Sequence, residues 1–98
     1  MSQQLEQIKD ILLNACKDFK NDIILLINDD NLKMKLEDAF NEISHIKILL
    51  FVYLIKSDNM HAQILEFCDK YNIEKNDYNI NIMKKHYNYF LEIKNCLI

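Results

Sequence analysis

Residues 46–55 read IKILLFVYLI and are the most apolar segment in the middle of the chain. Its only charged side chain is Lys47, and it contains none of the Gly, Pro, Asn, Asp or Ser residues that favour turns. Its β-branched residues would suit a strand, but its apolar positions continue a spacing of three and four residues that starts upstream at Leu36, which is typical of a helix. Since a helix that is apolar all round is buried all round, we predict a helix at the centre of the molecule.

Short polar clusters divide the chain into predicted helices. Asp, Asn and Ser side chains bond nearby backbone amides and favour caps and turns. They gather at 29–31, at 57–59 and more weakly at 72–77. The predicted helices cover approximately residues 2–28, 32–56, 60–71 and 78–95. Because the connections are short, the sequence predicts an all-α fold, a compact antiparallel bundle of about four helices forming one domain over residues 1–98.

The helix predicted over residues 32–56 has one apolar stripe that should face the core. Its members are Leu36, Ala39, Ile43, Ile46, Leu50 and Tyr53. Leu50 lies in the middle of the uncharged segment, and we expect its side chain to be fully buried.

The last predicted helix has two apolar stripes. The first consists of Ile80, Met83, Tyr87 and Phe90, and the second of Ile82, Tyr89, Ile93 and Leu97. A small bundle has too much surface for its volume to bury every apolar side chain, and surplus apolar area often marks a partner site. We therefore predict a non-enzymatic protein–protein interaction module that binds through the second stripe. A second copy of the chain is an expected partner, in a homodimer.

The first part of the chain is acidic. Residues 1–69 hold 7 Lys against 12 Asp and Glu. Asp29, Asp30, Asp38 and Glu42 form a predicted acidic face that would suit an inhibitor or immunity-type protein, because complementary fields speed association with a basic partner. Ordinary helix capping and solubility explain the same residues, so both interpretations stay open.

Residues 70–98 reverse the sign, with 5 Lys against 3 acids. Cations and aromatic rings follow one another in this segment, as in proteins that bind single-stranded nucleic acid. The residues are Lys84, Lys85, Tyr87 and Tyr89. Against this, the chain has no Arg, the commonest base-reading side chain, and its net charge of −3 would repel phosphate. Nucleic-acid binding is therefore the alternative function.

The missing residues exclude several enzyme classes. Without Gly, the chain cannot form the phosphate-binding loops of nucleotide enzymes. The three Cys lie too far apart for a structural zinc site. The Glu-x-x-His pattern at 42–45 resembles half of a di-iron site and lacks the required second copy. We expect no enzyme activity, cofactor or metal. An AT-rich genome would also explain the lack of Gly, Pro and Arg beside 15 Ile, 12 Asn and 12 Lys.

No targeting segment is visible. The first ten residues, MSQQLEQIKD, lack the basic start and apolar run of a signal peptide. The longest uncharged run in the apolar centre, residues 48–55, is far shorter than the roughly 20 residues of a membrane span. The sequence therefore predicts a cytoplasmic protein that does not enter membranes.

Overall fold

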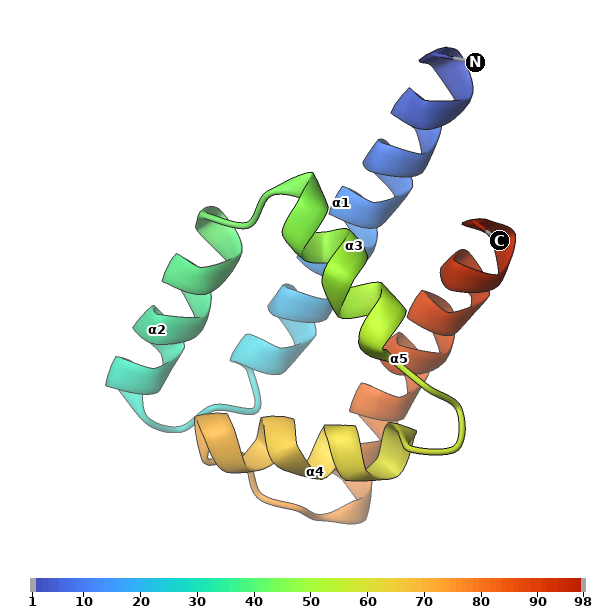
Figure 1. The fold of residues 1–98 in the computed structure, drawn as a ribbon. Coiled ribbons are helices and arrows are strands. Elements are labelled where there is room, and N and C mark those ends of the chain that lie inside the picture. The colour runs from blue at the N-terminus through green and yellow to red at the C-terminus, as the bar shows by residue number, and fades with distance from the viewer. Residues whose placement is uncertain (1, 98) are drawn as a thin grey trace.

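A computed structural model describes residues 2–97 of the chain, with the side chains of residues 6–44 and 46–96. All its regular elements are helices: α1 (Ser2–Ile24), α2 (Asp30–Asn41), α3 (His45–Leu54), α4 (Met60–Tyr71) and α5 (Asp77–Leu97) (Figure 1). The radius of gyration is 13.6 Å, close to the ~13 Å expected for a compact domain of 100 residues. The predicted all-α, compact fold is confirmed, with five helices over the described range instead of four.

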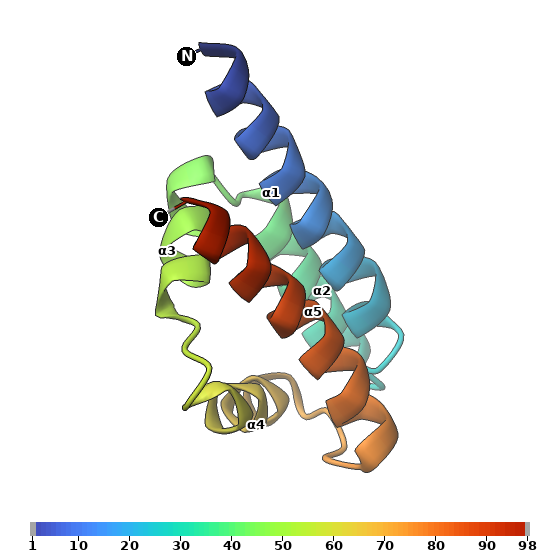
Figure 2. The same cartoon turned by 90° about the vertical axis from the view of Figure 1, so that its right-hand side faces the viewer.

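The two longest helices, α1 and α5, lie side by side and run in opposite directions (Figures 1 and 2). The N-terminal end of α1 and the C-terminal end of α5 therefore lie at the same end of the molecule. Helices α2 and α3 both pack on α1, and α3 also packs on α5. Helix α4 crosses the opposite end, where it packs on α5 and α2. Helices α3 and α4 have no close backbone approach within the described residues, and a side-chain hydrogen bond from Gln63 to the Leu54 carbonyl links them instead.

The core is built around Phe19 of α1, which is fully buried. Six rings surround it with centroids 5.4–6.3 Å away, namely Phe40, Phe51, Phe67, His86, Tyr87 and Phe90. Such tilted and edge-to-face contacts are the arrangements that aromatic rings prefer. His86 also bonds to the Asp22 carboxylate over 2.6 Å, which ties α5 to α1.

The helix predicted over residues 32–56 is two helices, α2 and α3. Glu42 ends α2, and Ser44 caps α3 by accepting a hydrogen bond from the backbone N–H of Lys47 at 3.3 Å. Because the chain leaves the helix and starts a new one here, different residues of α3 face the core. The buried ones are Ile48 and Val52 of α3 and Ile55 directly after it.

The predicted burial of Leu50 is therefore wrong, since its side chain is 59% exposed. Of the predicted stripe, Leu36 is buried and Ile43 is half-buried, whereas the others are exposed: Ala39, Ile46, Leu50 and Tyr53. The prediction treated residues 42–44 as part of one continuous helix and therefore assigned the stripe to the wrong side of α3.

The other boundaries lie close to their predicted positions, except that α1 ends at Ile24 and not near residue 28. Asp29 caps α2 by accepting bonds from the N–H groups of Asn31 at 2.8 Å and Leu32 at 3.2 Å. Asn72 ends α4 in the left-handed conformation with φ 51°. None of the helices in residues 2–97 has the length and apolar character needed to cross a bilayer.

Candidate protein-binding site

One side of α3 exposes four large apolar side chains to solvent. Their exposed fractions are 71% for Ile46, 59% for Leu50, 47% for Tyr53 and 65% for Leu54. The spacing of four, three and one residues places them on one side of the helix. We call these four residues the α3 face. In the sequence of α3, HIKILLFVYL, Lys47 is the only Lys, Arg, Asp or Glu.

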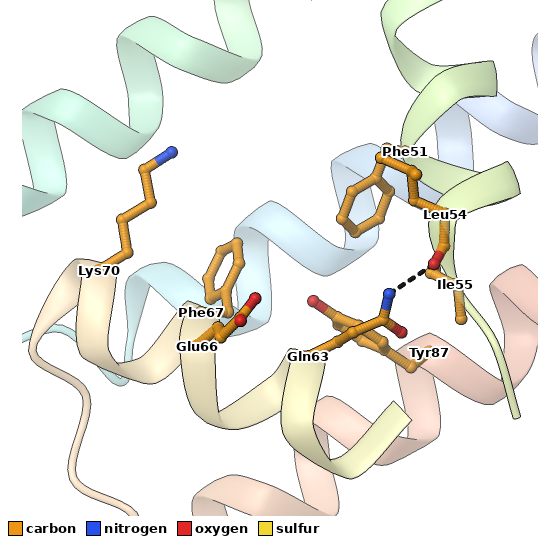
Figure 3. A pocket seen from close by; sticks show the side chains of 8 residues that line it. All are labelled: Phe51, Leu54, Ile55, Gln63, Glu66, Phe67, Lys70 and Tyr87. Carbon is orange, nitrogen blue, oxygen red and sulfur yellow. Dashed lines mark hydrogen bonds between the residues drawn. The ribbon is translucent and has the colours of Figure 1, made fainter. Parts of the chain in front are cut away.

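The C-terminal end of α3 has its backbone carbonyls satisfied by side chains from two other helices. Lys94 of α5 donates to the carbonyl oxygens of Tyr53 at 3.0 Å and Ile55 at 2.9 Å. Gln63 of α4 donates to the Leu54 carbonyl (Figure 3). The last carbonyls of a helix otherwise depend on water. A partner can therefore cover this end without leaving these carbonyls unpaired, which would otherwise weaken binding.

A pocket of about 250 Å³ opens between α3 and α4. Figure 3 shows its lining: Phe51, Leu54, Ile55, Gln63, Glu66, Phe67, Lys70 and Tyr87. We call it the α3–α4 pocket. Its walls are mainly apolar and aromatic, with polar groups supplied by α4 and α5. Because Leu54 belongs to both, the pocket and the α3 face form one continuous surface.

The Tyr87 hydroxyl is the unusual polar group in this pocket. Tyr87 is only 2% exposed, and its hydroxyl makes no hydrogen bond to any described side chain or backbone group. The hydroxyl oxygen is nevertheless accessible to solvent. Among the described residues, every fully buried polar side-chain atom has a hydrogen-bond partner, whereas this hydroxyl has none. Figure 3 shows the hydroxyl pointing into the space between Phe51 and Phe67. Burial raises the pKa of Tyr87, so the phenol stays neutral.

Two side chains of opposite charge stand at the pocket, Glu66 and Lys70. Within the described residues, neither forms an ion pair. The Lys70 ammonium lies 5.6 Å from the ring centre of Tyr71. Phe51, Phe67 and Lys70 also line a neighbouring cavity of about 200 Å³ that reaches toward α2. The apolar lining thus continues past the α3–α4 pocket.

The predicted binding stripe of the last helix is only partly accessible. Tyr89 is 45% exposed, Ile82 is half-buried and Ile93 is buried at 8%. The side chain of Leu97 lies outside the described residues. Tyr89 and Ile93 line a cavity of about 250 Å³ between α1 and α5, together with Ile8, Ile11, Glu92 and Cys96. The structure therefore unites two members of the predicted stripe with α1.

The predicted acidic residues are all exposed, but they lie toward opposite ends of α2. Asp29 and Asp30 stand at its start, where Asp29 caps the helix. Asp38 lies in its final turn and Glu42 just past its end. Asp38 lies eight positions after Asp30 in the helix, which is about 12 Å along the axis. The four carboxylates do not form a single compact patch.

The residues of the nucleic-acid alternative do not share one surface either. Tyr87 is in the core, Lys84 is half-buried, and Lys85 and Tyr89 are exposed. Lys85 and Tyr89 border a cavity of about 390 Å³ whose other lining residues are Asp18, Asn21, Asp22 and His86. Two carboxylates therefore stand beside the lysine, unlike the positively charged groove of a single-strand binder.

The cysteines have no shared site. Cys16 and Cys68 are buried and Cys96 is exposed. Burial raises the pKa of the Cys16 thiol to about 11 and is the main cause of a raised pKa for Cys68. Metal binding needs the thiolate. The described residues contain no group of three or more His, Cys, Asp or Glu side chains placed to hold a metal ion.

Sequence reasoning missed the α3 face, although one signal for it exists. Ser44 lies two residues before the apolar run, and serine in that position favours the start of a new helix. A prediction that began a new helix at Ser44 would not have extended the apolar stripe of α2 to Leu50. No comparable local signal reveals the roles of Gln63, Tyr87 and Lys94, which depend on contacts between distant segments.

Comparison with known proteins gives no match, whether to a family model, a curated protein or a solved structure.

Proposed function

We propose that this chain is a non-enzymatic protein-binding module and that the α3 face is its docking surface. The observation that carries the proposal is the grouping of Ile46, Leu50, Tyr53 and Leu54 on one exposed side of a capped helix. Single exposed apolar residues are normal, whereas contiguous apolar patches mark interaction sites. We assign docking to α3 in preference to α5 because Ile93 is buried.

The size of the face sets the expected affinity. Fully burying a large apolar side chain contributes about 1.5–3 kcal/mol, whereas association costs an estimated 4–15 kcal/mol or more. Four partly exposed side chains on a helix of 10 residues therefore support only weak binding by themselves. A tighter partner must extend past Leu54 into the α3–α4 pocket.

We also propose a cytoplasmic location and weak self-association through the α3 face. Three free thiols suit a reducing compartment. Two antiparallel copies of α3 related by a two-fold axis near Leu50 would place Ile46 opposite Tyr53 and Leu54 of the second copy. Such a contact is self-complementary, as two-fold interfaces require. Nucleic-acid binding has weaker support, because Tyr87 lies in the core.

The test is affinity capture from the native source with matched variants. The wild-type chain should retain a specific protein, and Leu50→Glu should lose it, because a carboxylate would be buried without a partner in the interface. The control is Leu25→Glu, which changes a leucine that is 79% exposed and lies outside α3. Equal capture by the wild type and Leu50→Glu would contradict the assignment.

A further inference from the structure

The α3–α4 pocket has the size and the lining of a site for an aromatic group. A cavity of 150 Å³ lined by apolar residues accepts benzene, so one of about 250 Å³ accepts a larger, two-ring group. Phe51 and Phe67 offer ring edges and faces for tilted packing. Glu66 and Lys70 carry opposite charges, so together they give the pocket lining no net charge. A neutral aromatic group fits this charge pattern.

We propose that the α3–α4 pocket receives a tryptophan side chain of the partner protein, whose indole N–H donates a hydrogen bond to the Tyr87 hydroxyl oxygen. This inference rests on the proposed function and names the anchor residue of that partner. Its second observation is the Tyr87 hydroxyl itself, which is on a side chain only 2% exposed, has no partner among the described residues and points into the pocket.

A protein partner explains the surroundings of the pocket better than a free small molecule. Leu54 joins the pocket to the α3 face, so a ligand that filled only the pocket would leave Ile46 and Leu50 uncovered. Interfaces commonly bury one aromatic anchor in a pocket and surround it with weaker contacts. The anchor comes from another protein, since this chain contains no Trp that a second copy could supply.

The lack of Trp also makes a direct test possible, because the protein adds no tryptophan fluorescence of its own. The probe is N-acetyl-tryptophanamide, and the comparison probe is its indole N-methyl derivative, which keeps both rings and lacks the N–H. We expect the emission of the first probe to shift to shorter wavelength and to saturate.

The Tyr87→Phe variant keeps the aromatic ring and removes the hydroxyl. It should weaken binding of N-acetyl-tryptophanamide by about two- to tenfold, the range for one neutral hydrogen bond. Binding of the N-methyl probe should stay unchanged. Absence of saturable binding, or equal effects of the variant on both probes, would overturn the inference.

Amide chemical shifts of the wild-type chain give a second measurement that does not depend on a variant. The probe should move the signals of Phe67 and Lys70. The cavity between α1 and α5 has a similar volume and serves as the control, so Ile11 should not respond. A response at Ile11 without one at Phe67 would overturn the inference.

This outcome is distinguishable from that of the docking proposal. Capture that depends on Leu50 together with no probe binding would reject the tryptophan pocket and keep the α3 face. If the probe binds and the Leu50→Glu variant captures the partner as well as the wild type does, the α3 face is rejected as the docking surface and the tryptophan pocket is kept.

Discussion

Phe19 contacts an aromatic ring from each of the other four helices, namely Phe40 of α2, Phe51 of α3, Phe67 of α4 and Phe90 of α5. Its inward position could be predicted, because Phe19 continues the three- and four-residue spacing of Leu12, Ala15 and Ile23, which is typical of one helix face. Its partners could not, since rings at 40, 51, 67 and 90 meet only after the chain has turned four times. Within one uninterrupted helix, periodicity indicates which face is buried, but it does not identify the neighbours of the buried side chains.

The contrast between Ile48 and Leu50 tests the orientation of α3 residue by residue. Ile48 is fully buried and Leu50 is 59% exposed. Replacing Ile48 by Ala should lower the free energy of unfolding by about 2–5 kcal/mol. Replacing Leu50 by Ala should lower it by less than about 1 kcal/mol, because surface substitutions have small effects. Denaturant titration of both variants checks this, and the reverse order would mean that α3 is rotated.

Helix boundaries could be predicted where Asp and Asn gather, and not where a single Ser acts. The clusters near residues 29–31 and 57–59 mark real breaks, and the helices that follow them start within a few residues of the prediction. The break at 42–44 has only Ser44 as a strong cap signal, within a stretch whose apolar spacing continues on both sides. Three residues of non-helical chain were enough to move Leu50 from the predicted core to the surface.

Helix α3 is also stabilised by a side chain from another helix, and this contact can be tested by substitution. Lys94 bonds two carbonyls at its C-terminal end, where a cation also interacts favourably with the helix dipole. Lys94→Met keeps the apolar stem and removes these bonds. We expect the free energy of unfolding to fall by about 1.5–3 kcal/mol, the range for a hydrogen bond to a charged group.

The matched control for this prediction is Lys85→Met. Lys85 lies on the same helix, is exposed and has no hydrogen bond among those found in the described residues. Thermal or denaturant unfolding should show little change for it. If both variants unfold alike, the contacts of Lys94 with α3 contribute nothing to stability.

For the whole molecule, the all-α class could be predicted because the chain lacks Gly and Pro and has helical spacing throughout. The candidate site could not. The α3–α4 pocket lies where α4 crosses the end of the α1–α5 pair, with the backbones of α3 and α4 apart and Gln63 as the link between them. That arrangement depends on packing between distant segments, which apolar periodicity does not encode.

Self-association is the whole-molecule prediction. Helix α3 has 10 residues and is about 15 Å long, so its face is smaller than the roughly 800 Å² per partner of a stable interface. Light scattering should therefore show an average mass that rises toward the dimer only at high protein concentration. Leu50→Glu should stay monomeric across the series. A tight dimer that survives Leu50→Glu would place the contact elsewhere.

The most direct measurement of the central claim is photo-crosslinking in the native cell. A photoreactive amino acid such as p-benzoylphenylalanine replaces Leu50 on the α3 face or, as the control, the exposed Leu25. We predict that the chain with the photoreactive residue at position 50 forms a discrete covalent adduct with another polypeptide and that the chain with it at position 25 does not. The mass of the adduct also separates a second copy from a different protein. Equal crosslinking at both positions, or none at position 50, would contradict the claim that the α3 face is a docking surface.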